Sequence, residues 1–318
     1  MMKDLKPPII LLGNTRSGTS IVQTLMSEHQ DIVGWYEPSE MWLYADPGRS
    51  HDEFDEHDAT DSVVHYIRKK FLKYQQRNGD RVIFEKTPKN ILKIPYVHAI
   101  FPEATYLYLV RDPFSFISSV EFKWQRSVTK NGIIRRLKST PITQVHHHLG
   151  SYLVQLYNKR ILRRKYLSIW GPRYKGIHED LKTLPLLTVI ARQWSIGSRK
   201  AEQDLALFDE GQVLRLRYED FVERPIDHLD RICSHCGYEL TGRMLEAAKT
   251  LVKSDRQQKW QRFNPIDLAQ ILPEIKVEMK RHGYEIPAEI IEAIGKIPDL
   301  QTTLSAYLEQ KRTTKQFS

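Results

Sequence analysis

The stretch PPIILLGNTRSGTSIVQTLM, residues 7–26, has the pattern of a phosphate-binding loop between a strand and a helix. An apolar run is followed by a glycine, four residues and a second glycine, and then by Thr19 and Ser20 at the start of a segment with helical periodicity. Glycines permit a tight turn, and the N-terminus of the next helix offers free N–H groups to an anion. The nucleotide-triphosphatase motif would have a lysine where Thr19 stands, whereas the only cation in this loop is Arg16. The stretch therefore predicts an anion site without the usual lysine, and the simpler alternative is a loop that caps a helix.

Short runs rich in apolar and β-branched residues predict five strands separated by helical segments. They are Ile9–Leu12, Ile32–Tyr36, Val82–Glu85, Thr105–Val110 and Val213–Arg217. Strands that alternate with helices form βαβ units around a parallel sheet, and the ligands of such sheets sit beyond the carboxyl ends of the strands. The candidate site residues are therefore those that follow each strand, in the stretches GNTRSGTS, EPSE, EKTPKN, RDPFSFISS and YED.

The composition is that of an ordinary globular protein, with 41% apolar and 27% charged residues in a chain of 318. No apolar run reaches membrane-spanning length, and the first residues lack the apolar region of a signal peptide. We therefore expect a cytoplasmic protein, with a peripheral position at a membrane as the alternative. The two cysteines, Cys233 and Cys236, are too few for a zinc site with four ligands. We expect them to be packing residues at the end of a helix.

The positive charge is concentrated in one segment. The chain has a net charge of +9, yet residues 121–175 contain 13 lysines and arginines against one acid, so this segment carries +12 and the remainder −3. The stretch around it has helical periodicity over Val145–Leu167 and Leu186–Leu207, and it interrupts the alternation of strands and helices. We predict a single domain over residues 1–318, with a basic helical insertion at about 121–210 and a helical tail from about 240.

At the strand ends the chain resembles sulfotransferases that use 3′-phosphoadenosine 5′-phosphosulfate (PAPS). RSGTS before a helix resembles the 5′-phosphosulfate loop of that family, and YLVRDPFSFISS resembles its 3′-phosphate motif. RYED after the last strand and a Lys-Trp pair near the C-terminus also resemble family segments. The resemblance implies an α/β, three-layer fold like that of P-loop NTPases. It further implies a donor site formed by Arg16, Ser17, Gly18, Thr19, Ser20, Arg111, Ser119, Tyr218 and Lys259.

The same resemblance implies three catalytic residues, Arg16, Glu37 and Lys86. A guanidinium such as that of Arg16 would stabilise charge on the oxygen between phosphorus and sulfur as it leaves, and the family needs no metal ion for this. Glu37 would take the proton of the acceptor hydroxyl, and Lys86 would neutralise the leaving phosphate or polarise the acceptor. The alternatives are that Glu37 caps a helix or pairs with a lysine, and that Lys86 is a surface lysine.

Glu40, His98 and the run His146–His148 are the alternative bases. No histidine follows a strand at the position where the small-phenol branch of the family has its base. Arg16 makes the loop more similar to the carbohydrate and tyrosylprotein branches, which use a glutamate. Three adjacent histidines on a helix point in different directions, so we do not expect a metal site there.

Three functions remain to be compared. The first is the transfer of a sulfuryl group from PAPS to a hydroxyl or amine of a small-molecule, glycan or lipid acceptor. The second, a P-loop kinase or NTPase, should have a lysine where Thr19 stands. The third, a non-catalytic binder of polyanions or of an acidic membrane surface through residues 121–175, leaves the RSGTS and RDP motifs unexplained. We therefore expect a PAPS-dependent sulfotransferase without a metal or a nucleic-acid partner, and the acceptor and the oligomeric state stay open.

Overall fold

The computed structural model describes residues 4–124, 169–209, 211–252 and 259–297. In that part of the chain a parallel sheet of five strands has the order β2-β3-β1-β4-β5. The strands are β1 (Ile9–Leu12), β2 (Ile32–Tyr36), β3 (Val82–Lys86), β4 (Thr105–Val110) and β5 (Val213–Arg217). All five match the predicted runs, and only β3 extends one residue further, to Lys86. The predicted α/β fold around a central parallel sheet is therefore confirmed.

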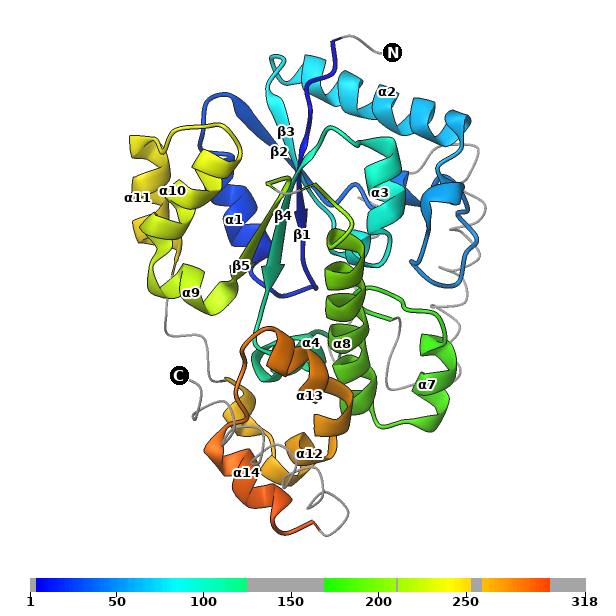
Figure 1. The fold of residues 1–318 in the computed structure, drawn as a ribbon, viewed down its shortest axis with the longest axis vertical. Helices are drawn as coiled ribbons and strands as arrows, with labels where there is room; N and C mark the ends of the chain where they lie inside the picture. Colours follow the sequence, from blue (N-terminus) through cyan, green and yellow to red (C-terminus); the bar gives the residue numbers. More distant parts are fainter. Residues whose placement is uncertain (1–3, 125–168, 210, 253–258, 298–318) are drawn as a thin grey trace, which may run out of the picture.

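Helices cover both faces of this sheet, which makes three layers (Figure 1). One layer contains α1 (Thr19–Met26), α9 (Tyr218–Glu223), α10 (Pro225–His235) and α11 (Gly242–Leu251). The other contains α2 (Asp61–Arg77), α3 (Ile94–Ile100) and α8 (Leu186–Leu205). Alternate residues of β1 enter the two cores, Ile10 and Leu12 on the second side and Ile9 and Leu11 on the first. A strand buried on both faces requires a continuous apolar sequence, which explains the run IILL.

The described part of the predicted insertion packs against helices of the core and of the C-terminal part. Its first residues belong to α4 (Pro113–Trp124), and its last part contains α7 (Ile177–Thr183) and α8, which nearly coincides with the predicted helix Leu186–Leu207. Residues 125–168, which include the other predicted helix, lie outside the described residues. Because α8 packs against α3 and α4 and buries Trp194 completely, it contributes to the main core.

The C-terminal helices gather at the end of the sheet where the strands finish (Figure 1). They are the short 3-10 helix η6 (Lys259–Arg262), α12 (Pro265–Gln270), α13 (Leu272–Arg281) and α14 (Ala288–Ile294). η6 packs on α4 and α13 packs on α8. These helices therefore border the region beyond the strand ends, where the ligands of parallel sheets bind.

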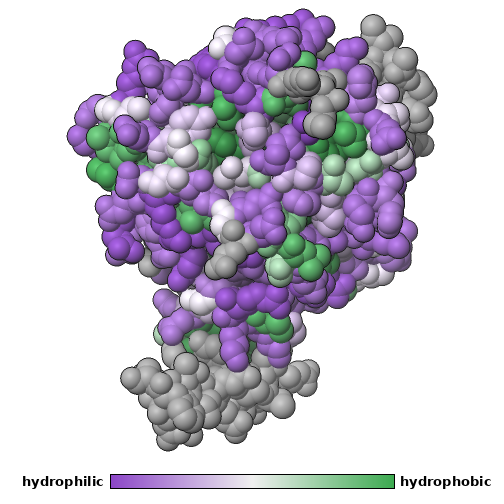
Figure 2. All heavy atoms as spheres, turned by 45° about the horizontal axis from the view of Figure 1, so that its top comes forward, coloured by the Kyte–Doolittle hydropathy of each residue, from purple (hydrophilic) through white to green (hydrophobic). Residues whose placement is uncertain are grey.

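The surface is mainly hydrophilic on the face shown in Figure 2, with apolar residues in small separate patches. Within the four described ranges, no helix combines the length and the apolar character that crossing a bilayer requires. The same ranges contain no group of three His, Cys, Asp or Glu side chains that could hold a metal ion.

Candidate active site

The loop between β1 and α1 has the strained backbone of a ligand-binding turn. Gly18 is in the left-handed region with φ 90°, and Arg16, which is not a glycine, is there with φ 66°. A Cβ atom on Gly18 would stand 2.2 Å from ring atoms of Tyr218, so only glycine fits at this position. The loop after β1 and the residue after β5 are therefore in direct contact. Helix α1 starts at Thr19, so its first N–H groups lie at this turn.

Asn14 anchors the loop to α8. Its Nδ2 donates to the carbonyl of Trp194 at 3.3 Å and to Oγ of Ser198 at 3.2 Å. A Cβ atom on Gly197 would come within 2.5 Å of Asn14 Oδ1, so the glycine permits this close approach. The buried amide thus joins segments about 180 residues apart and holds the loop rigidly on α8.

Several buried polar atoms in and near this loop have no protein partner. Within the part of the chain that the structure describes, they include the hydroxyls of Thr15 and Ser17, Oδ1 of Asn14 and Nε of Arg111. Ser17 is completely buried. Since leaving buried polar groups unpaired is unfavourable, the hydroxyl and N–H donors among them fit an anionic ligand that would accept from them.

The arginine after β4 and the serine of α4 contact the phosphate loop. Arg111 donates from NH1 to the carbonyl of Arg16 at 2.7 Å, and Arg16 donates from Nε to Oγ of Ser119 at 2.8 Å. The guanidinium of Arg111 also lies 4.6 Å from the centre of the Tyr218 ring. The structure therefore brings together four of the predicted donor-binding residues through direct contacts.

The two arginines form a concentrated positive field. Partial burial and the charge of Arg111 lower the pKa of Arg16, while the guanidinium stays charged at any physiological pH. Trp194 fixes the backbone of Arg111, because its Nε1 donates to the carbonyl of Arg111 at 2.9 Å. Such a pair of fixed cations is suited to bind phosphate groups.

Lys86 and Glu37 meet beside the phosphate loop. Nζ of Lys86 lies 2.7 Å from Oε1 of Glu37 and 3.2 Å from Oγ of Ser20, and it lies over the ring of Tyr36 at 4.1 Å. Only 1% of the Lys86 side chain is exposed, whereas 28% of the Glu37 side chain is exposed. The lysine is therefore fixed between the loop and Glu37, and the carboxylate is partly exposed to solvent.

The backbone at Glu37 is also unusual. Its φ is 47°, and among the described residues other than glycine only Arg16, Glu37 and Asp80 have positive φ. Left-handed conformations of such residues are unfavourable and occur often at functional sites. Two of these three positions are thus predicted catalytic residues.

A buried carboxylate accepts several hydrogen bonds at the end of β3. Glu85 is completely buried and accepts hydrogen bonds from Nε1 of Trp42, Oγ1 of Thr87 and Nδ2 of Asn90. Burial raises the pKa of Glu85 to about 7, although the hydrogen bonds from Thr87 and Trp42 oppose this shift. Glu85 therefore orders the backbone around Lys86 and has no direct access to solvent.

The acid after Tyr218 connects three segments. Glu219 accepts a hydrogen bond from the backbone N–H of Asp112 at 3.1 Å and one from the hydroxyl of Tyr284 at 2.8 Å. Asp112 in turn accepts from the N–H of Ser115 at 2.7 Å and so caps α4. Burial raises the pKa of both carboxyl groups. The YED segment thus positions the start of α4, which carries Ser119.

Lys259 is the predicted donor-binding residue that the structure does not bring into this network. It is exposed at the start of η6, and among the described residues no hydrogen bond or ion pair of its side chain is found. Its neighbour Arg262 instead contacts α4, donating to the carbonyl of Ser118 at 3.0 Å and pairing with Glu121 at 2.6 Å.

The alternative base His98 lies elsewhere. Its ring packs against Phe208 at 4.2 Å and against Tyr106, near the start of β4, at 6.0 Å. The start of a parallel strand is at the edge of the sheet opposite the site, so His98 cannot reach the acceptor. Glu40 follows Glu37 closely in the sequence, as the residue before the 3-10 helix η1 (Met41–Leu43), and the run His146–His148 lies outside the described residues.

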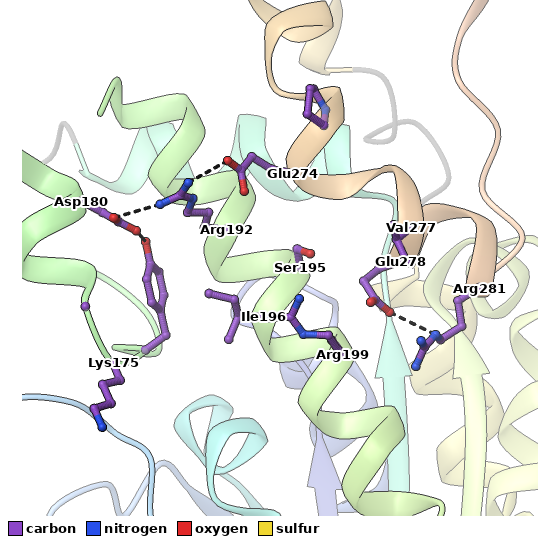
Figure 3. A pocket seen from close by; sticks show the side chains of 13 residues that line it. Lys175, Asp180, Arg192, Ser195, Ile196, Arg199, Glu274, Val277, Glu278 and Arg281 are labelled. Atoms are coloured by element: carbon purple, nitrogen blue, oxygen red, sulfur yellow. Dashed lines mark hydrogen bonds and ion pairs between the residues drawn. The ribbon is translucent and has the colours of Figure 1, made fainter. Parts of the chain in front are cut away.

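A separate polar cavity of about 530 Å³ lies between α7, α8 and α13 (Figure 3). Its charged groups largely pair with one another, because Arg192 bridges Asp180 and Glu274, and Arg281 pairs with Glu278. None of the predicted site residues lines this cavity.

The partners of several supporting residues have no signal in the sequence. Trp194 lies on a helix and Tyr284 in an irregular segment, and their roles depend on contacts with Arg111 and Glu219 that are distant in the chain. Asn14 belongs to the phosphate-binding pattern, but nothing in the pattern indicates its partners on α8.

Comparison with known proteins identifies a matching family and one related protein. A profile of the sulfotransferase family matches residues 7–169 and 164–242. The nodulation protein NoeE of Sinorhizobium fredii is 26% identical over 264 residues, which cover 76% of this chain and 53% of NoeE. The chain thus spans about half the length of this curated relative.

Two solved structures share the fold. The sulfotransferase domain of the Synechococcus PCC 7002 olefin synthase has a TM-score of 0.54 at 15% identity and covers 89% of this chain and 96% of that domain. The sulfotransferase domain from the curacin biosynthetic pathway has a TM-score of 0.53 at 15% identity, with 89% and 99% covered. These similarities confirm the predicted fold like that of P-loop NTPases.

Proposed function

Because the chain belongs to the sulfotransferase family, we propose that it transfers the sulfuryl group of PAPS to a hydroxyl or amine of an acceptor. The observation that carries the proposal is the contact chain from Arg111 to Arg16 and on to Ser119. It joins the loop that resembles the 5′-phosphosulfate motif to the residues that resemble the 3′-phosphate motif. A ligand with phosphate groups at both ends of a nucleoside fits this arrangement better than a triphosphate.

The residues present fit the donor. The loop offers the N–H groups at the start of α1 and the unpartnered hydroxyl of Ser17, and Arg111 offers an unpartnered Nε. Gly18 allows the Tyr218 ring to lie against the loop, and we expect this ring to contact the nucleotide. Charge-assisted hydrogen bonds from arginine to phosphate are among the stronger polar contacts in proteins.

In the proposed reaction, bound PAPS supplies the sulfuryl group. The acceptor oxygen forms a bond to sulfur, the bond from sulfur to the bridging oxygen breaks, and its electron pair stays on the departing 3′-phosphoadenosine 5′-phosphate (PAP). Glu37 takes the proton of the acceptor hydroxyl, a contribution of about 10²–10⁴-fold in rate for a general base. Lys86 and Arg16 stabilise the negative charge that develops on the departing phosphate.

The contact between Lys86 and Glu37 is also the pairing with a lysine that the sequence leaves as the alternative for Glu37, so the proposed roles require the lysine to turn toward the donor. The lysine lies between the carboxylate and Ser20 at the start of α1, so it can interact with a group on either side. A donor bound at the loop would place negative charge near Nζ, and Glu37 would then be free to accept a proton. The acceptor is a small molecule or the end of a glycan or glycolipid.

A ligand panel tests the donor. We expect PAP to raise the melting temperature without added metal, and ATP with Mg²⁺ to raise it far less, because a bound ligand stabilises the native state by RT ln(1 + [L]/Kd). Equal shifts from both nucleotides would instead support the kinase alternative. Transfer of radiolabelled sulfate from PAPS to a mixture of sugar and phenol acceptors would then demonstrate the reaction.

A further inference from the structure

A second group of charged side chains lies around Asp52, outside the contacts described so far. Asp52 is completely buried and accepts from NH2 of Arg173 at 2.9 Å and from the Arg173 backbone N–H at 2.8 Å. Nζ of Lys89 lies 3.3 Å from the same carboxylate. The Asp52 cluster is defined here as Asp52, Lys89, Lys93 and Arg173.

Lys93 is the unusual member of the Asp52 cluster. It is completely buried, and within the described part of the chain its Nζ has no hydrogen-bond partner, lying 4.4 Å above the ring of Phe54. Burial lowers the pKa of Lys93 to about 7, although the charge of Asp52 opposes this shift. The nearby Arg49 pairs with Asp58 at 2.7 Å and with Asp46 at 3.3 Å. Within the Asp52 cluster itself, one carboxylate therefore faces the two full positive charges of Lys89 and Arg173.

The position of the Asp52 cluster relates it to the acceptor side of the site. Lys89 belongs to the 3-10 helix η3 (Pro88–Leu92), three residues after Lys86, and Asp52 lies in the segment that follows β2. The strands β2 and β3 are those that end at Glu37 and Lys86, whereas the donor motifs follow β1 and β4. The cluster thus shares the half of the sheet edge that carries the proposed base.

Arg173 also links the cluster to the phosphate loop. It follows Gly171 by two residues, and a Cβ atom on Gly171 would stand 3.1 Å from Oγ1 of Thr15. The Asp52 N–H donates to the carbonyl of Arg173 at 2.7 Å, so backbone and side chain together hold this segment in place. The segment that carries Arg173 therefore passes close to the phosphate loop at Gly171, and Asp52 fixes its position.

Lys89 and Arg173 have N–H donors that do not bind Asp52. Lys89 uses one of its three N–H donors on Asp52, and Arg173 uses Nε and NH2. Among the described residues, no hydrogen bond of Arg173 NH1 is found, and the side chains of Lys89 and Arg173 are 28% and 24% exposed. They can therefore reach an incoming anion without giving up Asp52.

We propose that Lys89 and Arg173 form a subsite for a carboxylate carried by the acceptor, as in a uronic acid residue of a glycan. This inference rests on the proposed sulfuryl transfer, because it places the acceptor beside Glu37. An entering carboxylate would balance the excess positive charge and accept from the free donors of both side chains. A purely structural cluster needs only the clamp between Asp52 and Arg173, and Lys89 would then be dispensable.

Two matched glycosides test the subsite. Para-nitrophenyl β-glucuronide carries a carboxylate where para-nitrophenyl β-glucoside has a hydroxymethyl group. With the donor site saturated by PAP, we expect the glucuronide to bind about 10-fold more tightly than the glucoside by calorimetry, in line with a charge-assisted hydrogen bond. Lys89→Gln should reduce this preference to about two-fold or less, and it leaves the clamp of Arg173 intact.

Lys182→Gln serves as the control, because Lys182 is an exposed lysine on α7 that pairs with Glu179 at the surface. This control should keep the full preference for the glucuronide. Equal affinities of the two glycosides in the wild-type protein, or an unchanged preference in Lys89→Gln, would overturn the subsite. Failure of the proposed sulfuryl transfer is seen separately, as the absence of any stabilisation by PAP, and the glycosides are then compared without PAP.

Discussion

The ammonium of Lys86 pairs with the carboxylate of Glu37 at 2.7 Å, and this ion pair joins the ends of two adjacent strands. The lysine is almost completely buried, while the glutamate is partly exposed and has a left-handed backbone. Holding a carboxylate on a left-handed residue next to a fixed cation is a feature of a site whose geometry is set before the substrate arrives. The proposed base and the proposed charge-stabilising lysine therefore form one unit.

Replacing the proposed base should separate chemistry from binding. Glu37→Gln keeps the shape and the hydrogen bonding of the side chain but removes its capacity to take a proton, so kcat should fall about 10²-fold or more. The affinity for PAP, measured by calorimetry, should stay near that of the wild type. Glu40→Gln is the matched control and should retain most of the activity. A Glu37→Gln enzyme with nearly normal turnover would place the base elsewhere.

The cation of the pair should matter for the rate as well. Lys86→Met keeps most of the apolar stem but removes the charge beside the loop, and we expect kcat to fall by about 10²–10³-fold. Steady-state kinetics with labelled PAPS measure this loss. Lys182→Met, a change of the same type at the surface, should leave kcat unchanged. A fall in Lys86→Met no larger than in that control would mean that Lys86 only supports the local fold.

Arg111 should discriminate the 3′-phosphate. In the wild type, PAP should bind more tightly than AMP, which lacks this phosphate. The expected difference in binding free energy is that of a charge-assisted hydrogen bond, about 1.5–3 kcal/mol. Arg111→Ala should remove most of the difference while the affinity for AMP changes little. Calorimetric titrations of both nucleotides measure the effect. A preference for PAP that survives the substitution would show that the nucleotide lies in another orientation.

Lys93 should make the stability depend on pH. Burial holds its folded-state pKa at about 7, whereas a lysine in an unfolded chain titrates near about 10.4. Between these values the unfolded chain binds one more proton than the folded chain, so the free energy of unfolding rises with pH by up to about 1.4 kcal/mol per unit. The charged neighbours that also act on Lys93 are Asp52, Lys89, Arg173 and Arg49.

Urea denaturation at several pH values between about 7.5 and 9 tests this contribution. Lys93→Met should flatten the rise with pH, and it should make the protein more stable near neutral pH because an unpartnered buried amine is removed. Lys69→Met changes an exposed lysine of α2 and should leave the slope unaltered. A slope in Lys93→Met equal to that of the wild type would refute the expectation.

Local patterns in the sequence were sufficient for the sheet and for which residues follow the ends of its strands. The strand runs are short and apolar because both faces of a parallel sheet are covered. Each strand can therefore be recognised from the apolar run in its own segment. The glycine spacing around Arg16 and the charged residues after the strands are local patterns too. They indicate residues that meet, since the strand ends of a parallel sheet lie at one edge. From these features the α/β fold and the region of Arg16, Glu37, Lys86 and Arg111 could be predicted.

Only the tertiary structure decided how these residues are supported. Asn14 contacts α8 across 180 residues, Arg173 binds Asp52 across 121, and Tyr284 binds Glu219 across 65. Such contacts depend on how whole layers pack, and a single polar residue in a helix or loop carries no periodic signal that would indicate its partner. The unpartnered ammonium of Lys93 is of the same kind, because its burial follows from packing against Phe54 and Asp52. The sequence by itself determined which chemical groups reach the strand ends, and the packing of distant segments determined their geometry and their charge balance.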